Sequence, residues 1–230
     1  MKPATVLLVF AHPDDEVLGC GGTIAKLSEE GARVFTLILG EGITSRQSHR
    51  EPNLVAKELA DLKNSAFEAN KRIGVDPEGV YLCHLPDNRF DTVPLLDIIK
   101  QIEKYIEKVH PTIIFTHSQY DLNIDHQITY KAVLTATRPQ PSHPVKEIYA
   151  CEVLSSTEWM YPQGFQPNMY SLLSEKHISA KIEALKCYSS EIRSYPHPRS
   201  IEGVECLAKW RGLQVGCNYA EAFQVVRRIL

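Results

Sequence analysis

The chain has 230 residues, of which 43% are hydrophobic and 23% are charged, and its formal net charge is −3. These values are ordinary for a soluble globular protein, and the length suits one domain with a well-buried core. The slightly negative charge and the lack of any stripe rich in lysine or arginine exclude a typical nucleic-acid-binding surface. No apolar run reaches membrane-spanning length and no secretory leader precedes the first predicted strand, so a cytoplasmic protein is expected.

The six cysteines indicate neither a disulfide framework nor a cysteine-based zinc site, because they are scattered and form no C-x-x-C pair. Such cysteines are expected to be mostly buried thiols in a reducing compartment. Their positions are Cys20, Cys83, Cys151, Cys187, Cys206 and Cys217.

Strand and helix patterns alternate along residues 1–140. Residues 5–10 are apolar and β-branched, which is typical of a fully buried strand, and a helical pattern then runs up to Gly31. Gly74 is a suitable C-terminal cap for the next long helix. Further strands are predicted at residues 34–39, 80–83 and 112–116, and further helices at residues 54–73, 95–109 and 127–137. The alternation predicts an α/β fold with a mostly parallel sheet and helices on both faces.

The pattern changes after Thr137. We expect the part that follows, residues 141–230, to pack on the sheet and help to wall a pocket, without forming a separate domain. The chain is therefore interpreted as one domain, residues 1–230, whose core is residues 1–140. The later elements are a proline-rich turn at 138–144, a strand at 148–154, a loop at 155–168, a helix at 174–188, a polar segment at 189–200, a helix near 204–211 and a final segment at 220–229.

One histidine and three carboxylates stand between the first strand and the first helix, in residues 11–16, AHPDDE. In open α/β sheets ligands bind at this edge. The acidic side chains repel one another unless a positive charge compensates them; a helix N-terminus offers about half a charge and a divalent cation far more. Ordinary first-turn caps would also explain the stretch. A dinucleotide loop would not, because Gly19, Gly21 and Gly22 miss the G-x-G-x-x-G spacing.

A second polar loop, residues 117–126, follows the fourth predicted strand and ends at His126. Because parallel strands bring their carboxyl ends to one edge of the sheet, His12, Asp15 and His126 could converge there. Two imidazoles and one carboxylate with an open fourth position form a catalytic zinc arrangement. The same donors would also suit Fe²⁺ or Mn²⁺.

Together, the two loops resemble the PIG-L/LmbE-type family of zinc-dependent N-acetylsugar deacetylases. The resemblance is carried by AHPDDE at residues 11–16 and by Asp125-His126, and it spans residues 1–140. It implies a Rossmann-like, three-layer LmbE-like fold. Residues 193–199 and 211–223 are also similar to a bacterial subgroup associated with surface-polysaccharide sugars.

The resemblance implies one zinc ion per chain, held by His12, Asp15 and His126, with Asp14 as the general base. Zinc can lower the pKa of a bound water to about 7, so hydroxide forms near neutral pH and attacks the acetamide carbonyl. Asp14 would take the proton and could pass it to the departing amine. The expected reaction releases acetate from an amino sugar similar to N-acetylglucosamine, such as a surface-polysaccharide or nucleotide-sugar precursor.

One position departs from the family pattern. The second loop commonly contains H-x-x-H, whose first histidine helps to stabilise the oxyanion or protonate the leaving group, but Asn123 stands there in this chain. An asparagine amide donates a hydrogen bond but cannot shuttle a proton. Another acid is then needed, and His84, His117 and His197 are the candidates, although each also fits an ordinary surface or core histidine.

Several other polar residues are candidates for supporting roles. Asp121 and Asp125 could orient a ligand histidine or form ordinary loop turns. Trp159 and Tyr161 could stack on a sugar, although core or interface packing explains them as well. The candidate substrate-binding residues are Arg46, Asp87, Asn88 and Arg89, of which Asp87 and Asn88 would also suit a turn.

Two other functions remain open at this stage. A non-catalytic relative that binds sugars or nucleotides is favoured only by Asn123. A zinc amidohydrolase acting on a non-sugar acyl-amine would use the same metal site with different pocket walls. In each case the partner is a small molecule, and assembly into a homo-oligomer is compatible with the sequence.

Overall fold

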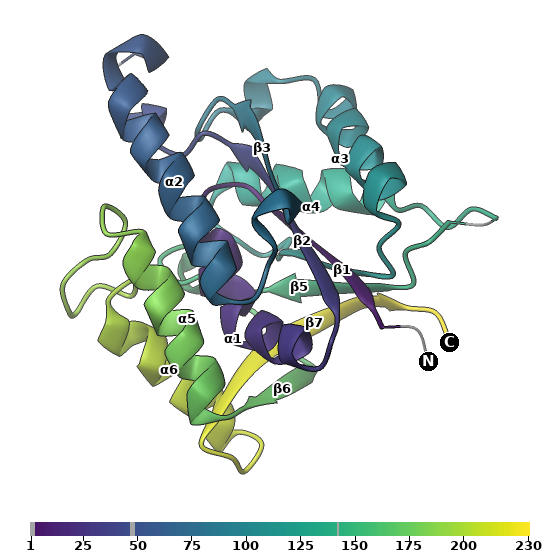
Figure 1. The fold of residues 1–230 in the computed structure, drawn as a ribbon, viewed down its shortest axis with the longest axis vertical. Coiled ribbons are helices and arrows are strands. Elements are labelled where there is room, and N and C mark those ends of the chain that lie inside the picture. Colours follow the sequence, from purple (N-terminus) through teal and green to yellow (C-terminus); the bar gives the residue numbers. More distant parts are fainter. Residues whose placement is uncertain (1–2, 47–48, 142) are drawn as a thin grey trace.

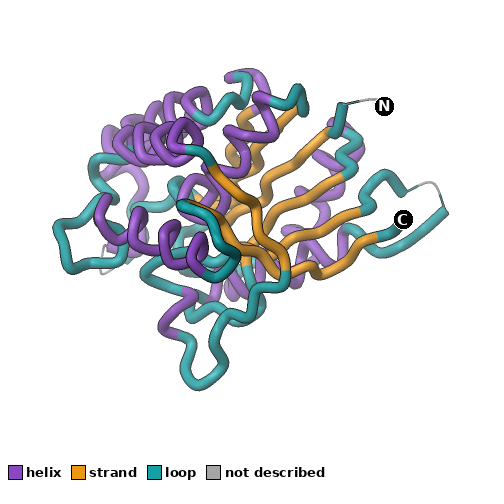
Figure 2. Tube along the Cα trace, turned by 90° about the horizontal axis from the view of Figure 1, so that it is seen from below, coloured by secondary structure: helices purple, strands orange, loops and turns teal. Residues whose placement is uncertain are grey.

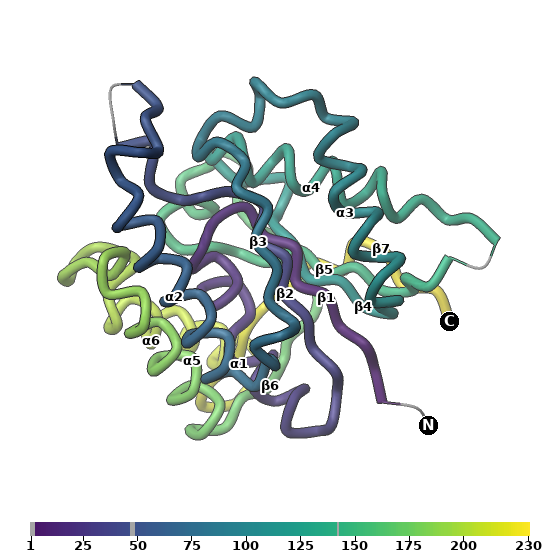
Figure 3. The backbone as a smooth tube through the Cα atoms, turned by 45° about the horizontal axis from the view of Figure 1, so that its top comes forward, coloured from purple at the N-terminus to yellow at the C-terminus, as the bar shows by residue number. Residues whose placement is uncertain are grey.

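The computed structural model describes residues 3–46, 49–141 and 143–230. Seven strands form one sheet in the order β3-β2-β1-β4-β5-β7-β6 (Figure 1). Both termini lie on the same side of the molecule (Figures 1 and 3). The strands are β1 (Thr5–Phe10), β2 (Arg33–Gly40), β3 (Val80–Leu85), β4 (Ile113–His117), β5 (Glu147–Cys151), β6 (Met169–Leu173) and β7 (Tyr219–Arg228).

Helices cover both faces of this sheet, as predicted. α1, α2 and α5 pack together on one face, and α3 and α4 pack on the other (Figures 1 and 3). Figure 2 shows the strands side by side, with helices around them. None of the helices in the described ranges has both the length and the apolar character needed to cross a membrane. The helices are α1 (Asp15–Glu29), α2 (Ala56–Arg72), α3 (Leu95–Val109), α4 (Ile124–Ala136), α5 (Glu175–Cys187) and α6 (Ile201–Leu213).

The core lies on both sides of β1, every residue of which is buried. Because side chains of a strand alternate between its two faces, Val6 and Leu8 pack toward α1, α2 and α5, whereas Leu7 and Val9 pack toward α3 and α4. This explains why residues 5–10 are apolar without alternation: a central parallel strand has no face toward water.

The sheet is parallel from β3 to β5 and antiparallel beyond. β7 pairs antiparallel with both β5 and β6, so the last strand of the chain lies between two earlier ones. Residues 169–173, for which the sequence predicts no element, form β6, and the final segment, whose type the sequence leaves undefined, forms β7. The expected strand at residues 148–154 ends at Cys151.

Two helix boundaries differ from the prediction for local reasons. α4 begins at Ile124 and not at Gln127, because the Asn123 side chain accepts a hydrogen bond from the backbone N–H of Asp125 at 2.8 Å and caps the helix. α2 is preceded by a 3₁₀ turn at Pro52–Val55, which fills the start of the predicted helix. Its end agrees with the prediction, since Gly74 takes a φ of +86° just after it.

Candidate active site

The candidate site lies at the carboxyl ends of the two central strands. β1 leads into His12 and β4 leads into the loop before α4, whose first turn carries His126. The strands β1 and β4 are neighbours, but the chain proceeds from β1 toward β2 and β3 on one side and from β4 toward β5 on the other. Such a switch point opens a crevice between adjacent loops, which is where open α/β sheets bind ligands.

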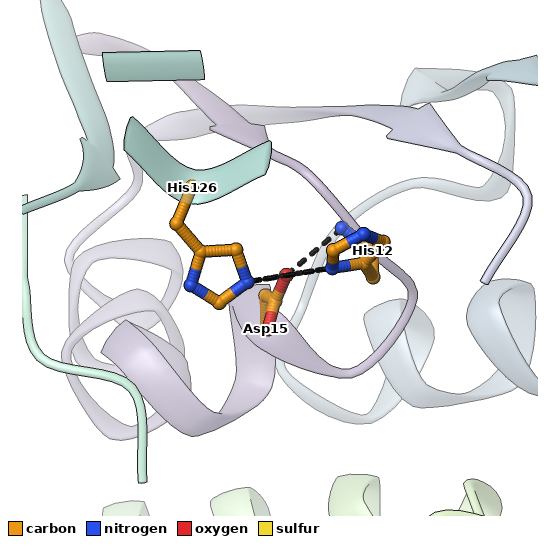
Figure 4. A group of neighbouring side chains, drawn as sticks. All are labelled: His12, Asp15 and His126. Atoms are coloured by element: carbon orange, nitrogen blue, oxygen red, sulfur yellow. Dashed lines mark hydrogen bonds and ion pairs between the residues drawn. The ribbon is translucent and has the colours of Figure 1, made fainter. Parts of the chain in front are cut away.

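Three donor atoms from these loops form a small triangle (Figure 4). Oδ2 of Asp15 lies 3.3 Å from Nδ1 of His12 and 3.2 Å from Nε2 of His126. The two ring nitrogens are 3.3 Å apart. Ligands held 2.0–2.2 Å from a tetrahedral zinc ion are separated by roughly 3.3–3.6 Å, so the donor set fits such an ion without rearrangement.

The other ring nitrogen of each histidine meets a carboxylate. Nε2 of His12 lies 3.0 Å from Oδ2 of Asp125, and Nδ1 of His126 lies 3.1 Å from Oδ1 of Asp121. Donation of an N–H to these carboxylates leaves the lone pairs of Nδ1 of His12 and Nε2 of His126 directed at Asp15 and at one another. Carboxylates orient metal-binding histidines in this way in many proteins.

Two further groups of side chains have the composition of a metal site: His117, Asp121 and His126, and His12, Asp87 and Asp125. Both use the ring nitrogen that already faces a carboxylate. Their geometry is that of hydrogen-bonded pairs around the central triangle, so we do not interpret them as separate cation sites.

The carboxylates make this part of the protein strongly negative. Burial lowers the pKa of His12, but hydrogen bonds to Asp125 and Asp15 outweigh burial and raise it well above its usual value. Burial also opposes protonation of His126, and the charges of Asp15 and Asp121 outweigh it, raising the pKa to about 9. A site that stabilises positive charge this strongly also favours a divalent cation.

Asp14 lies beside the triangle but contributes no atom to it. Its backbone has a φ of 105°, which is unusual for a residue with a side chain, and its N–H donates to Oε2 of Glu16 at 3.1 Å. Nη1 of Arg199 donates to its Oδ2 at 3.1 Å. Burial and the neighbouring charge of Asp15 raise the pKa of Asp14 well above its usual value, against the opposing charge of Arg199.

Glu16 supports Asp14 from the core side. It is fully buried, and its Oε1 accepts from Oη of Tyr188 at 2.6 Å and from Nδ2 of Asn70 at 3.0 Å. Burial raises its pKa to about 7, with the Tyr188 hydrogen bond acting in the opposite direction. Glu16 therefore anchors the backbone of the loop and is itself held by Asn70 of α2 and by Tyr188 at the end of α5.

A cavity of about 330 Å³ opens over Asp14 and the three donor residues, His12, Asp15 and His126. Of the substrate-binding candidates predicted from sequence, Arg46, Asp87 and Asn88 line the cavity and Arg89 does not. Both oxygens of Asp87 are engaged, since Oδ2 accepts from the backbone N–H of Ser45 and Oδ1 from Nδ2 of Asn88. Asn88 is also engaged at both ends of its amide, because its Oδ1 accepts from Nδ2 of Asn123 at 2.8 Å.

Aromatic residues contribute unequally. Trp159 lines the cavity and is 41% exposed, whereas Tyr161 is 81% exposed and does not line it. His197 packs edge-on against Trp159, with ring centroids 6.4 Å apart. Trp159 is thus the aromatic side chain that a bound molecule would meet.

Asn123 lines the cavity, but both ends of its amide are in use. Its Oδ1 caps α4, and its Nδ2 donates to Oδ1 of Asn88 at 2.8 Å. None of the three alternative proton donors, His84, His117 and His197, is among the described residues that line the cavity. His117 is fully buried, accepts from the backbone N–H of Ala11 and stacks on His126, which is the arrangement of a structural histidine.

The structure adds two charged residues of the C-terminal part to the contacts of the predicted site. Glu191 and Arg199 line the cavity from the polar segment at residues 189–200. Glu191 accepts two hydrogen bonds of 2.6 Å from Nη2 of Arg46. The sequence predicts a polar segment here, but no periodicity in it indicates which side chains turn inward.

Comparison with known proteins places these features in a family. The PIG-L family model, described as GlcNAc-PI de-N-acetylase, matches residues 7–137. An uncharacterised deacetylase, YaiS of Escherichia coli K12, is 26% identical over 199 residues that cover 82% of this chain and 92% of the relative. A probable N-acetyl-alpha-D-glucosaminyl L-malate deacetylase 2 of Bacillus cereus is 28% identical over 195 residues, 81% of this chain and 83% of the relative.

The fold is shared with solved structures. N,N'-diacetylchitobiose deacetylase from Pyrococcus horikoshii superposes with a TM-score of 0.77 and 20% identity, covering 98% of this chain and 85% of the other. The likeness thus extends beyond the residues matched by the family model, into the antiparallel part of the sheet. Because that model matches more than half of the sequence and includes both loops of the site, the chain belongs to the PIG-L family.

Proposed function

We propose that the protein is a metal-dependent hydrolase that removes the N-acetyl group from an amino sugar similar to N-acetylglucosamine. One observation carries the proposal: three donor atoms, 3.2–3.3 Å apart, face a cavity that is also lined by Asp14, a carboxylate outside this donor set. The relatives are named as deacetylases, and the one from Bacillus cereus as acting on an N-acetylglucosaminyl compound, which supports this substrate class.

His12, Asp15 and His126 would hold the ion, which is proposed to be Zn²⁺, with Fe²⁺ or Mn²⁺ as alternatives for the same donor set. Such an ion acts as a Lewis acid and lowers the pKa of water. Asp121 and Asp125 would keep the two imidazoles in the tautomers that present a lone pair to it.

Asp14 is proposed as the group that moves protons. A general base works best when its pKa lies near the working pH, and burial raises the pKa of this carboxyl. It would take a proton from the attacking water and return it to the departing amine. Because His84, His117 and His197 do not line the cavity, we assign both transfers to Asp14.

The cavity walls are suited to a sugar. Arg46, Asn88 and Asn123 present polar groups, and Trp159 presents an aromatic face. Small-molecule sites commonly combine an apolar or aromatic wall with a few directed polar groups. We propose that Asn123 orients the substrate through the second N–H of its Nδ2 and moves no proton, because a side-chain amide is neither an acid nor a base at neutral pH.

The test is acetate release by the purified protein from a panel of N-acetyl amino sugars, glycosides and nucleotide sugars. We expect about one metal ion per chain, loss of turnover with a chelator, and recovery on adding back Zn²⁺, Fe²⁺ or Mn²⁺. Asp14→Asn should keep the metal and lose about 10²–10⁴-fold in kcat, the range for a general base.

The outcomes separate the alternatives. Tight sugar binding without acetate release would support a non-catalytic binding protein. Release from simple acyl-amines but not from sugars would support a different amidohydrolase. An Asp14→Asn variant with full activity would remove Asp14 from the mechanism.

A further inference from the structure

Arg199 holds one carboxylate oxygen of Asp14, the proposed base. Its Nη1 donates to Oδ2 of Asp14 at 3.1 Å, and no hydrogen bond from the described residues reaches the other oxygen, Oδ1. The Asp14 side chain is only 4% exposed, so this pair differs from a surface ion pair, whose net contribution is usually small. The carboxylate is thus held by one oxygen while the other remains available.

Arg199 is itself held by a second carboxylate. Oε2 of Glu191 lies 3.7 Å from the same Nη1, and the Glu191 side chain is 7% exposed. Glu191 accepts in turn from Nη2 of Arg46 and, at 3.0 Å, from Oγ of Ser190. The alternating charges therefore connect the loop after β2, the segment after α5 and Asp14.

The backbone and side chain of Asp14 have separate anchors. Glu16 accepts the Asp14 N–H at 3.1 Å and supports the left-handed backbone. Arg199, which comes from the other wall of the cavity, fixes the rotation of the carboxylate. Residue 123 is an uncharged amide, and the guanidinium that contacts the proposed base comes from the C-terminal part of the chain.

From this geometry we infer that Arg199 is the positioning residue for Asp14, and that Glu191 holds Arg199 in place. The inference rests on the proposed function insofar as Asp14 is the base. A reacting group displaced by about 1 Å can lose about 10²-fold in rate, so loss of this anchor should lower kcat more than it weakens substrate binding.

The experiment compares Arg199→Ala and Arg199→Lys with wild type and with Arg72→Ala, an exposed arginine at the end of α2 outside the cavity. Arg199→Ala should lose about 10²-fold in kcat with KM changed by less than about threefold, and should keep its metal. Added guanidinium should restore part of this kcat. Arg199→Lys should lie in between, because an ammonium group carries the charge without the planar fork. Arg72→Ala should match wild type.

Crystal structures of the metal-loaded wild type and Arg199→Ala provide a readout that is independent of turnover. The Asp14 carboxylate should keep its rotamer in the first and turn away in the second. An unchanged rotamer, an unchanged kcat or loss of the metal in Arg199→Ala would overturn the inference. If the wild type hydrolyses no N-acetyl substrate, the proposed function fails, while the two structures still decide whether Arg199 positions Asp14.

Discussion

Residues 1–140 and 141–230 contribute to the site in different ways. In the first part, His12 and His126 follow neighbouring parallel strands, so the sheet itself brings them together. In the second part, Glu191 and Arg199 arrive on a segment without helix or strand. A parallel sheet brings the residues that follow its strands to one edge in every protein of this architecture. An irregular segment places its residues through contacts that are specific to this chain.

The two parts also interlock in the core. Nζ of Lys181 on α5 lies 2.6 Å from Oε1 of Glu221 on β7, and both side chains are buried. Lys181 donates to the carbonyl oxygen of Leu18, and Glu221 accepts from the backbone N–H groups of Gly22 and Thr23. This pair joins the C-terminal part directly to the backbone of α1, the helix that begins with Asp15.

The comparison predicts that the largest effect on activity comes from the first part. Asp15→Ala removes the oxygen shared by both histidines, so we expect loss of the metal and at least about 1,000-fold lower kcat/KM. Metal analysis and acetate release measure this. Asp121→Asn, which changes a partner of His126 and none of the three proposed ligands, should weaken metal affinity by about 10–100-fold. Equal metal loss in both variants would contradict the assignment of Asp15 as the direct ligand.

The next largest effect should be on stability, at the joint between the parts. Lys181→Met leaves the Glu221 carboxylate buried without its cation, and should lower the free energy of unfolding by about 3–5 kcal/mol. Urea denaturation measures this change. Lys186→Met, on the exposed side of the same helix, should cost less than about 1 kcal/mol. Lys181→Arg, which keeps the cation beside Glu221, should lose less than Lys181→Met; an equal loss would show that the charge imbalance is not the cause.

The smallest effect should come from the surface contact between α1 and α5. Hydrogen bonds from Lys176 and His177 lower the pKa of the exposed Glu29 carboxyl. A lowered pKa in the folded state means that the stabilisation is present above the unfolded pKa and disappears as the pH falls through the folded one. Wild type should therefore be slightly more stable than Glu29→Gln at about pH 6, and the two should converge near about pH 3. Thermal unfolding across this range tests the sign; a difference that grows on acidification would contradict it.

Much of the parallel half was accessible from sequence. The uninterrupted apolar run at residues 5–10 and the turn signals around it predict a buried central strand, and the structure confirms it. The α/β alternation likewise predicts helices on both faces, because parallel strands require crossovers. The same reasoning brings His12, Asp15 and His126 to one edge, and their donor atoms lie within 4.8 Å of one another.

The remainder depended on contacts that leave no local pattern. No sequence pattern indicates β6, because it is a short strand at the edge of the sheet and pairs there with β7, which is distant in the sequence. α4 starts three residues before its predicted start because the Asn123 side chain caps it, a contact that the apolar periodicity of residues 127–137 does not indicate. The polar segment contains two arginines, Arg193 and Arg199, and only its path in the structure shows which of them meets Asp14.

The position of β7 between β5 and β6 determines the order in which the sheet can assemble. During synthesis the five parallel strands can associate once β5 has left the ribosome, but β6 then has no neighbour in the sheet, because its partner β7 follows it in the chain. Glu221, which ties β7 to α1, arrives with the same strand. Nascent chains arrested before residue 219 should therefore contain a β6 without a strand partner. The sheet is completed when the ten-residue strand β7, Tyr219–Arg228, pairs with β5.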